Sequence, residues 1–186
     1  MHSFYNFKGF KEASLDLFQP LTVLIGPNGS GKSNLIEAVE LFSFIAQGRP
    51  LHLVSDIGNG GGGELQVRGG IQSCPRHGSD TFAFKFSAFI KFDGENKPFE
   101  YYVKVKTKPH PKITEEKLAF INCPMIFQSL SQTTNSTSGN IKIQYNNFAR
   151  GSHKPVIEIS NDRSALSRYS EFASKNINKL DQCVSV

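Results

Sequence analysis

Eight residues near the N-terminus, GPNGSGKS at 26–33, restrict what this 186-residue chain can fold into more than any other feature. They follow a continuously apolar, β-rich run, LTVLI at 21–25, and precede a segment with helical periodicity. A buried strand, a glycine loop and a helix in this order are the structural context of the phosphate-binding pattern G-x-x-x-x-G-K-S, the P-loop. The sequence therefore predicts a site for the polyphosphate of a nucleotide.

Each residue type in this loop has a physical role in holding phosphate. Glycine lets the backbone curl so that successive N–H groups point inward, and the N-terminus of the following helix adds partial positive charge at the same place. Lys32 is expected to reach the β and γ phosphates, and Ser33 to offer its hydroxyl to Mg²⁺. We therefore expect ATP and Mg²⁺ as ligands, with Ser33 as the metal ligand. The candidate nucleotide-binding residues of the loop are Gly26, Pro27, Asn28, Gly29, Ser30, Gly31, Lys32 and Ser33.

The chain is expected to form one domain in four parts, since its length suits a single core. Residues 1–57 contain two short edge strands broken at Gly9, then the buried strand 21–25, the loop, and a helix that Gly48 and Pro50 end. Its apolar residues are Leu35, Ala38, Val39, Leu41, Phe42, Ile45 and Ala46. Residues 58–63, GNGGGG, form a flexible connector. They also fit G-x-G-x-x-G, but a dinucleotide site is not expected because no buried strand precedes them and no helix follows.

Residues 64–160 are expected to form an antiparallel β portion. Apolar side chains alternate from Phe82 to Phe92 and from Phe99 to Val105, with DGEN at 93–96 as the turn of a hairpin. Further strands are expected at 117–121, 141–145 and 156–160, with the polar loop SQTTNSTSGN before the second of the three. Residues 161–186 are expected to form a helix, capped by Asp162 or Ser164. Its apolar stripe contains Leu166, Tyr169, Phe172, Ala173, Ile177 and Leu180.

Composition narrows the environment of the protein and its partners. No apolar run reaches the ~18 residues needed to cross a bilayer and the N-terminus has no secretory pattern, so we expect a cytoplasmic location without a membrane partner. The three cysteines, Cys74, Cys123 and Cys183, form no CxxC pair, which argues against a disulfide framework or a zinc site. The net charge of +5 is compatible with a nucleotide or nucleic acid but does not require one.

The N-terminal fifth of the chain, NFKGFKEASLDLFQPLTVLIGPNGSGKSNLIEAVELF, resembles the opening of the RecF, SMC and OLD type ATPases. It resembles more closely the AAA-type ATPases related to abortive-infection and RecF-like proteins. The resemblance implies an α/β P-loop NTPase fold: a mixed central sheet with a P-loop helix and an antiparallel β portion, part of an ABC-type ATPase head. It also implies that Asn28 and Asn34 support the phosphates and the metal. Lys8 would take the place of the basic residue that leans over the nucleotide, and the alternative for Lys8 is an ordinary solvated lysine.

The groups that hydrolysis needs are not recognised, so the catalytic residues remain unknown. A Walker B strand should end in two carboxylates, one for Mg²⁺ and one to activate water. The nearest imitation, LHLVSD at 51–56, has polar residues where that strand should be apolar, and SLSQ and ALSR lack the glycine pair of a signature motif. We expect an N-terminal lobe, from a truncated gene, an engineered fragment or a split protein, that binds ATP and turns it over slowly. The resemblance implies a second ATPase lobe or a homodimer partner, and a role in DNA repair, DNA processing or phage defence.

Two alternatives for the whole chain stay open, together with two smaller features. A small phosphotransferase would have this length, but it should continue as repeated βα units with arginines in a lid. An interaction module with a vestigial loop would bind no nucleotide. On the second strand of the hairpin an outward face with lysines is either a contact for a nucleic acid backbone or a solvated sheet edge; it carries Glu100, Tyr102, Lys104, Lys106 and Lys108. Gln66 and Gln72 could contact the metal as the glutamine of a Q-loop does, but neither lies in a recognisable Q-loop sequence.

Overall fold

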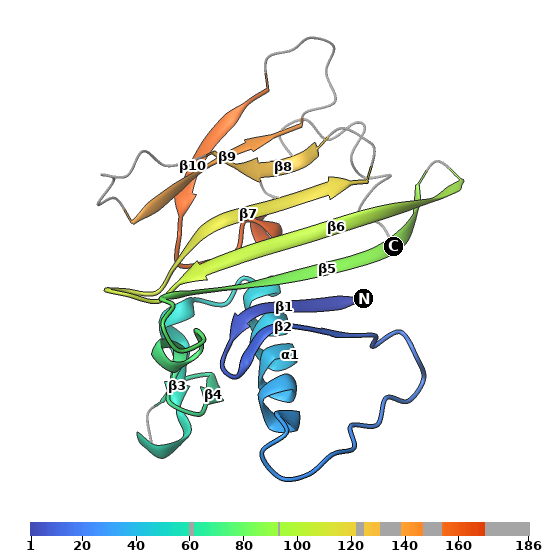
Figure 1. The fold of residues 1–186 in the computed structure, drawn as a ribbon. Helices are drawn as coiled ribbons and strands as arrows, with labels where there is room; N and C mark the ends of the chain where they lie inside the picture. The colour runs from blue at the N-terminus through green and yellow to red at the C-terminus, as the bar shows by residue number, and fades with distance from the viewer. Residues whose placement is uncertain (60–61, 93, 122–124, 131–138, 147–153, 170–186) are drawn as a thin grey trace.

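The computed structural model describes residues 1–59, 62–92, 94–121, 125–130, 139–146 and 154–169 (Figure 1). Its main feature is an eight-stranded sheet with the strand order β10-β9-β8-β7-β6-β5-β1-β2, in which every neighbouring pair is antiparallel. The strands are β1 (His2–Phe7), β2 (Phe10–Leu15), β5 (Thr81–Phe92), β6 (Glu95–Lys106), β7 (Lys112–Phe120), β8 (Met125–Ser129), β9 (Asn140–Tyr145) and β10 (Val156–Ser160).

The long helix and a small second sheet lie near the β1–β2 end of the large sheet (Figure 1). The helix α1 (Lys32–Ala46) follows the glycine loop, and a separate pair of parallel strands is formed by β3 (Val54–Asp56) and β4 (Leu65–Val67). Four short 3-10 helices complete the described elements: Leu51–Leu53, Ile57–Asn59, Ile71–Ser73 and Leu166–Arg168. In the part of the chain that the structure describes, no helix is long and apolar enough to cross a membrane.

The core forms where the apolar stripe of α1 meets phenylalanines of the sheet. The Phe42 ring lies 5.4 Å from that of Phe84 on β5 and is stacked on Tyr101 of β6, with 5.9 Å between the centroids. Ala38, Leu41 and Ile45 are fully buried on the same side of the helix. The predicted helix is therefore confirmed, and its contact with the sheet holds the end of the glycine loop in place.

The predicted hairpin is confirmed with a tighter turn. Phe92 pairs directly with Glu95, so only residues 93–94 connect β5 to β6, and Gly94 takes the left-handed conformation with φ of 77°. The predicted strands 117–121, 141–145 and 156–160 correspond to β7, β9 and β10. The strand β8 was not predicted, because MIFQS offers neither length nor alternation.

The segment 21–25 corrects the sequence-based prediction of a buried strand. It has no strand structure, and Leu21, Val23 and Ile25 are 78%, 64% and 91% exposed. A strand needs neighbours that accept and donate its backbone hydrogen bonds, and no described strand pairs with this segment. The expectation of a mixed central sheet is also wrong. The large sheet is antiparallel throughout, and parallel pairing among the described strands is confined to β3 and β4.

Two further expectations about strand position are corrected. β1 is not an edge strand, since it pairs with β2 on one side and β5 on the other. β6 is also interior, between β5 and β7, so its lysine-bearing face is not a sheet edge. Lys104 and Lys106 on this face form ion pairs with Glu115 and Asp80 at 2.8 and 3.2 Å. Cross-strand charge pairing accounts for the lysine pattern.

The glycine-rich segment 58–63 connects β3 to β4. The strand β3 is only partly buried, and the 3-10 helix Ile57–Asn59 lies between it and the glycines. No α-helix follows the segment in the described residues. Beyond β10, the predicted helix is not seen in the described residues 161–169, which contain the short 3-10 helix Leu166–Arg168 with Ala165 as its N-cap and no side-chain cap. The N–H of Leu166 donates to the Ser164 hydroxyl at 3.0 Å. The remaining stripe from Phe172 to Leu180, most of the loop 131–140, Cys123 and Cys183 lie outside the described residues. Cys74 is a buried free thiol whose pKa burial raises to about 12.

Candidate nucleotide-binding site

The loop 26–31 joins the exposed segment 16–25 to the first turn of α1. Gly29 and Gly31 have φ of 82° and 94°, a backbone conformation that side chains other than glycine disfavour. Gly31 is also in close contact, because a Cβ there would lie 2.8 Å from the ring of Phe10. The Ser30 N–H donates to the Pro27 carbonyl at 3.2 Å. The loop is therefore a tight turn whose glycines at 29 and 31 are needed by its geometry.

The Lys32 side chain folds back across this turn. Its Nζ donates to the carbonyl oxygens of Gly26 and Pro27 at 2.7 and 2.8 Å, and to Ser30 Oγ at 3.4 Å. Ser33 is exposed in the first turn of α1. The arrangement brings an ammonium group, a hydroxyl and the N-terminal N–H groups of a helix to one exposed place, which is the set of groups that binds a polyphosphate anion.

Lys8 lies beside α1 rather than in solvent. Its side chain is only 10% exposed, and its Nζ pairs with Glu37 of α1 and donates to the Arg68 carbonyl at 3.1 Å. Its backbone has φ of 46°, uncommon for a residue other than glycine. The solvated-lysine alternative is therefore wrong, and Lys8 connects the β1–β2 turn to the helix that begins at the loop.

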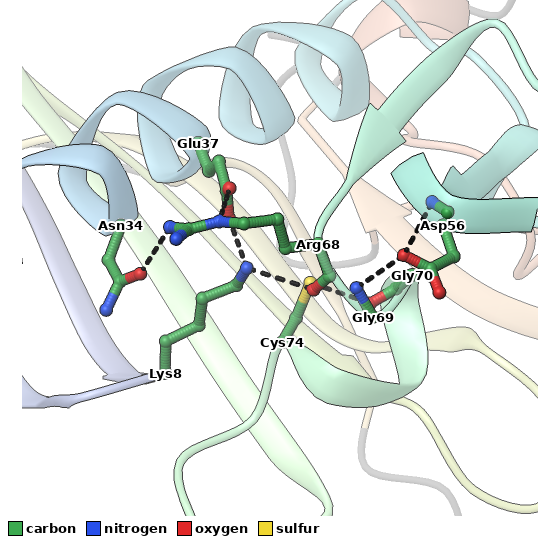
Figure 2. Close-up of polar contacts among 9 residues, drawn as sticks. Lys8, Asn34, Glu37, Asp56, Arg68, Gly69, Gly70 and Cys74 are labelled. Carbon is green, nitrogen blue, oxygen red and sulfur yellow. Dashed lines mark hydrogen bonds and ion pairs between the residues drawn. The ribbon is translucent and has the colours of Figure 1, made fainter.

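Arg68 joins the same cluster and was not foreseen from the sequence (Figure 2). Its Nε donates to Glu37 Oε1 at 2.5 Å and its Nη2 to Asn34 Oδ1 at 2.8 Å. Burial alone would raise the pKa of Glu37, but the hydrogen bonds and charges of Lys8 and Arg68 outweigh burial and lower it. The available signal was Glu37 itself: a carboxylate between apolar positions of a buried helix face needs basic partners.

The remaining sequence candidates lie apart from this cluster or have other roles. Asn28 is exposed in the loop, and Gln66 and Gln72 are exposed on and after β4. Asp56, in the segment that imitates a Walker B strand, accepts the N–H groups of Gly58 and Gly69 at 3.3 and 2.8 Å. Within the described ranges, no group of three or more His, Cys, Asp or Glu is placed to hold a metal ion.

Comparison with known proteins places this chain in the class of ABC-like AAA ATPases of the RecF and SMC kind. The chain belongs to the family described as "AAA domain, putative AbiEii toxin, Type IV TA system", whose model matches residues 21–130. That range contains the glycine loop, α1 and Arg68.

Individual relatives share shorter segments. The "Chromosome partition protein Smc" of Methanocaldococcus jannaschii is 56% identical over 34 residues, 18% of this chain and 3% of that protein. The "DNA replication and repair protein RecF" of Gloeobacter violaceus is 44% identical over 52 residues, which are 28% of this chain and 13% of that protein. The RecF protein of Synechococcus sp. (strain CC9605) is 39% identical over 82 residues, with 36% of this chain and 22% of that protein covered. The chain thus matches less than a quarter of the length of each of these relatives. No solved structure matches.

Proposed function

We propose that this chain binds ATP with Mg²⁺ through residues 26–34, as the N-terminal part of a RecF/SMC-like ATPase. The observation that carries the proposal is the Lys32 ammonium group held across a turn with two left-handed glycines, directly before α1. A polyphosphate supplies oxygens that can replace the two carbonyls around Lys32, and the N–H groups of the loop and helix add further donors. Family membership supports a nucleotide as the source of that polyphosphate.

Within this site we assign the metal to Ser33, whose hydroxyl would be one ligand of Mg²⁺ while phosphate oxygens and waters supply the others. Asn28 and Asn34 support the phosphates. Lys8 contributes to the site indirectly, because its ammonium group forms an ion pair with Glu37 on α1.

Hydrolysis requires carboxylates that we do not assign to this chain, and we infer that a second ATPase lobe or a second copy supplies them. The exposed side chains of Leu21, Val23 and Ile25 support such a partner, because large apolar groups in a segment without secondary structure are suited to contact with another chain. The names of the relatives, which mention chromosome partition and DNA replication and repair, support a role in DNA repair or other DNA processing. We propose phage defence as the alternative process, and the cytoplasm as the location. Alone, the chain is expected to release ADP only slowly.

A titration of the purified chain with a fluorescent ATP analogue, with and without Mg²⁺, tests nucleotide binding. Lys32→Ala is expected to weaken binding at least about tenfold, the loss of one charge-assisted hydrogen bond or more. Lys11→Ala is the matched control, because Lys11 is exposed on β2 and its charge is the same. Equal affinity of the two variants, or no binding by the wild type, would refute the proposal and favour a vestigial loop. ADP release that depends on an added small-molecule acceptor would instead indicate a phosphotransferase.

A further inference from the structure

The backbone of Arg68 is fixed from several sides at the end of β4. The Gly69 N–H donates to Asp56 Oδ1 at 2.8 Å, and the Arg68 carbonyl accepts from Lys8 Nζ at 3.1 Å. Gly69 and the following Gly70 both have left-handed φ, 75° and 62°, so the chain turns sharply directly after Arg68 (Figure 2). Such a turn fixes the position of the backbone from which the Arg68 side chain extends.

From this point the guanidinium group reaches two residues of α1. Nε is paired with Glu37 in the second turn, and Nη2 donates to Asn34 Oδ1 in the first turn. The fork geometry of a guanidinium suits two acceptors on one helix face, and the Arg68 side chain is still 52% exposed. Arg68 therefore holds the residue that directly follows the proposed metal ligand, Ser33.

The contact with Arg68 decides which end of the Asn34 amide is available. An asparagine side chain has one acceptor oxygen and one NH₂ group with two donors. With Oδ1 engaged by Arg68, the NH₂ group is left, and it has no hydrogen-bond partner among the described residues. It lies toward Gly9, where an added Cβ would be 3.6 Å from Asn34 Nδ2. An anion is bound by donors, so this orientation of the amide is the one that a phosphate group needs.

We propose that Arg68 is a positioning residue of the nucleotide site, which fixes Asn34 with its NH₂ group directed away from Arg68 and available to the polyphosphate. The inference rests on the proposed function of the loop and deepens it. It also gives the β3–β4 pair a role: Asp56 holds the turn, the turn holds Arg68, and Arg68 orients a residue of the first helical turn.

The test is a double-mutant cycle with the fluorescent ATP analogue and Mg²⁺ as the probe, on the full chain. Arg68→Met keeps the apolar stem and removes the guanidinium, and it is expected to weaken binding about fivefold, within the net range of one ordinary hydrogen bond. Asn34→Ala should weaken binding by a similar factor. The double variant should be no weaker than either single variant, because each substitution removes the same interaction with the nucleotide. Arg68→Lys, which restores a donor, should recover part of the affinity.

Two controls separate this role from other effects. Arg76→Met removes the same charge from an exposed arginine and should change affinity less than about twofold. Thermal unfolding of every variant is measured as well: a purely structural role of Arg68 would lower stability while leaving affinity unchanged well below the unfolding transition. Equal affinities of Arg68→Met and Arg76→Met, or additive losses in the double variant, would overturn the inference while Lys32→Ala still weakens binding. If Lys32→Ala also binds normally, the proposed function fails and the inference with it.

Discussion

The β5–β6 hairpin and the segment 21–25 are both rich in residues that favour strands, yet they differ completely in structure. In the hairpin every backbone position from Thr81 to Phe92 has a partner on β6, and Phe82 and Phe84 are buried against α1 and β1. In the segment 21–25 the side chains of Leu21, Val23 and Ile25 face solvent and the backbone has no ladder partner among the described strands. Apolar residues thus become a strand only where neighbours complete the hydrogen bonds.

The same contrast holds for polar groups. In the sheet, the buried Glu116 carboxylate is surrounded by donors from Tyr101 and from the turn after β10. In the loop, the exposed carbonyls of Gly26 and Pro27 accept from the long side chain of Lys32, and Pro27 also accepts the N–H of Ser30. Interactions inside the sheet therefore stabilise the fold, whereas those of the loop can be exchanged for a ligand at little cost.

The largest effect on stability is expected at the centre of the packed region. Phe84→Ala removes a fully buried ring that contacts Phe4, Phe7 and Phe42, and it should lower the free energy of unfolding by about 4 kcal/mol. Urea unfolding followed by circular dichroism measures this difference. Phe89→Ala on the same strand is the control, since that ring is exposed. Similar losses in the two variants would show that the sheet face is assigned wrongly.

A smaller loss is expected when the buried carboxylate is removed. Glu116 Oε1 accepts from the Tyr101 and Ser164 hydroxyls at 2.8 and 2.6 Å, and Oε2 accepts from the Ala165 N–H at 2.7 Å. Glu116→Ala leaves the Ala165 N–H and one of the two hydroxyls, which otherwise bond only to each other, buried without an acceptor, and it should destabilise the fold by about 3 kcal/mol. The neighbouring Glu115→Ala, whose side chain is exposed, should change stability by less than about 1 kcal/mol. Equal unfolding free energies for both variants would contradict the assigned contacts.

These two regions also show what the sequence could predict. Alternation identified β5 and β6, and helical spacing identified α1, because in both cases the local pattern and the tertiary contacts agree. The segment 21–25 has a pattern as strong as either, but its structure depends on a neighbour that no local pattern encodes. The order of the strands in the sheet was likewise not predictable from residue spacing.

At the candidate site the sequence predicted the residues of the loop but not those that surround it. The pattern from Gly26 to Ser33 is contiguous, so its chemistry is visible in one stretch. Arg68 is 34 residues from Asn34 in the sequence and meets it only through the turn after β4. Glu37 could have indicated that basic partners exist, but not which of the 21 lysines and arginines they are.

The cluster around Glu37 provides a prediction that depends on pH. Because the folded-state pKa of Glu37 lies below its ordinary value of 4.5, its ionisation stabilises the fold above that pH, and this contribution is lost as the pH falls through the lowered pKa. Glu37→Gln should therefore be less stable than the wild type by about 2 kcal/mol at neutral pH, and the difference should shrink in acid. Urea unfolding at a series of pH values measures it. Glu40→Gln, exposed on the same helix, is the control, and a difference for Glu37→Gln that is independent of pH would contradict the ion-pair cluster.

The smallest effect on stability is expected in the exposed segment 21–25, whose apolar side chains can be compared directly with those of the core. Ile25 has the side chain of a core residue but is almost fully exposed, so Ile25→Ser removes no buried contact and should change the free energy of unfolding by less than about 0.5 kcal/mol. Ile45→Ser, a substitution of the same residue type on the buried face of α1, should cost several times more, about 3 kcal/mol or above. The two substitutions together measure how much of the contribution of an isoleucine to the free energy of unfolding comes from its neighbours. A large loss for Ile25→Ser in the purified chain would mean that this segment is already packed, either against the sheet or against a second copy. Repeating the unfolding at several protein concentrations distinguishes these two outcomes, because only contact with a second copy makes the loss depend on concentration.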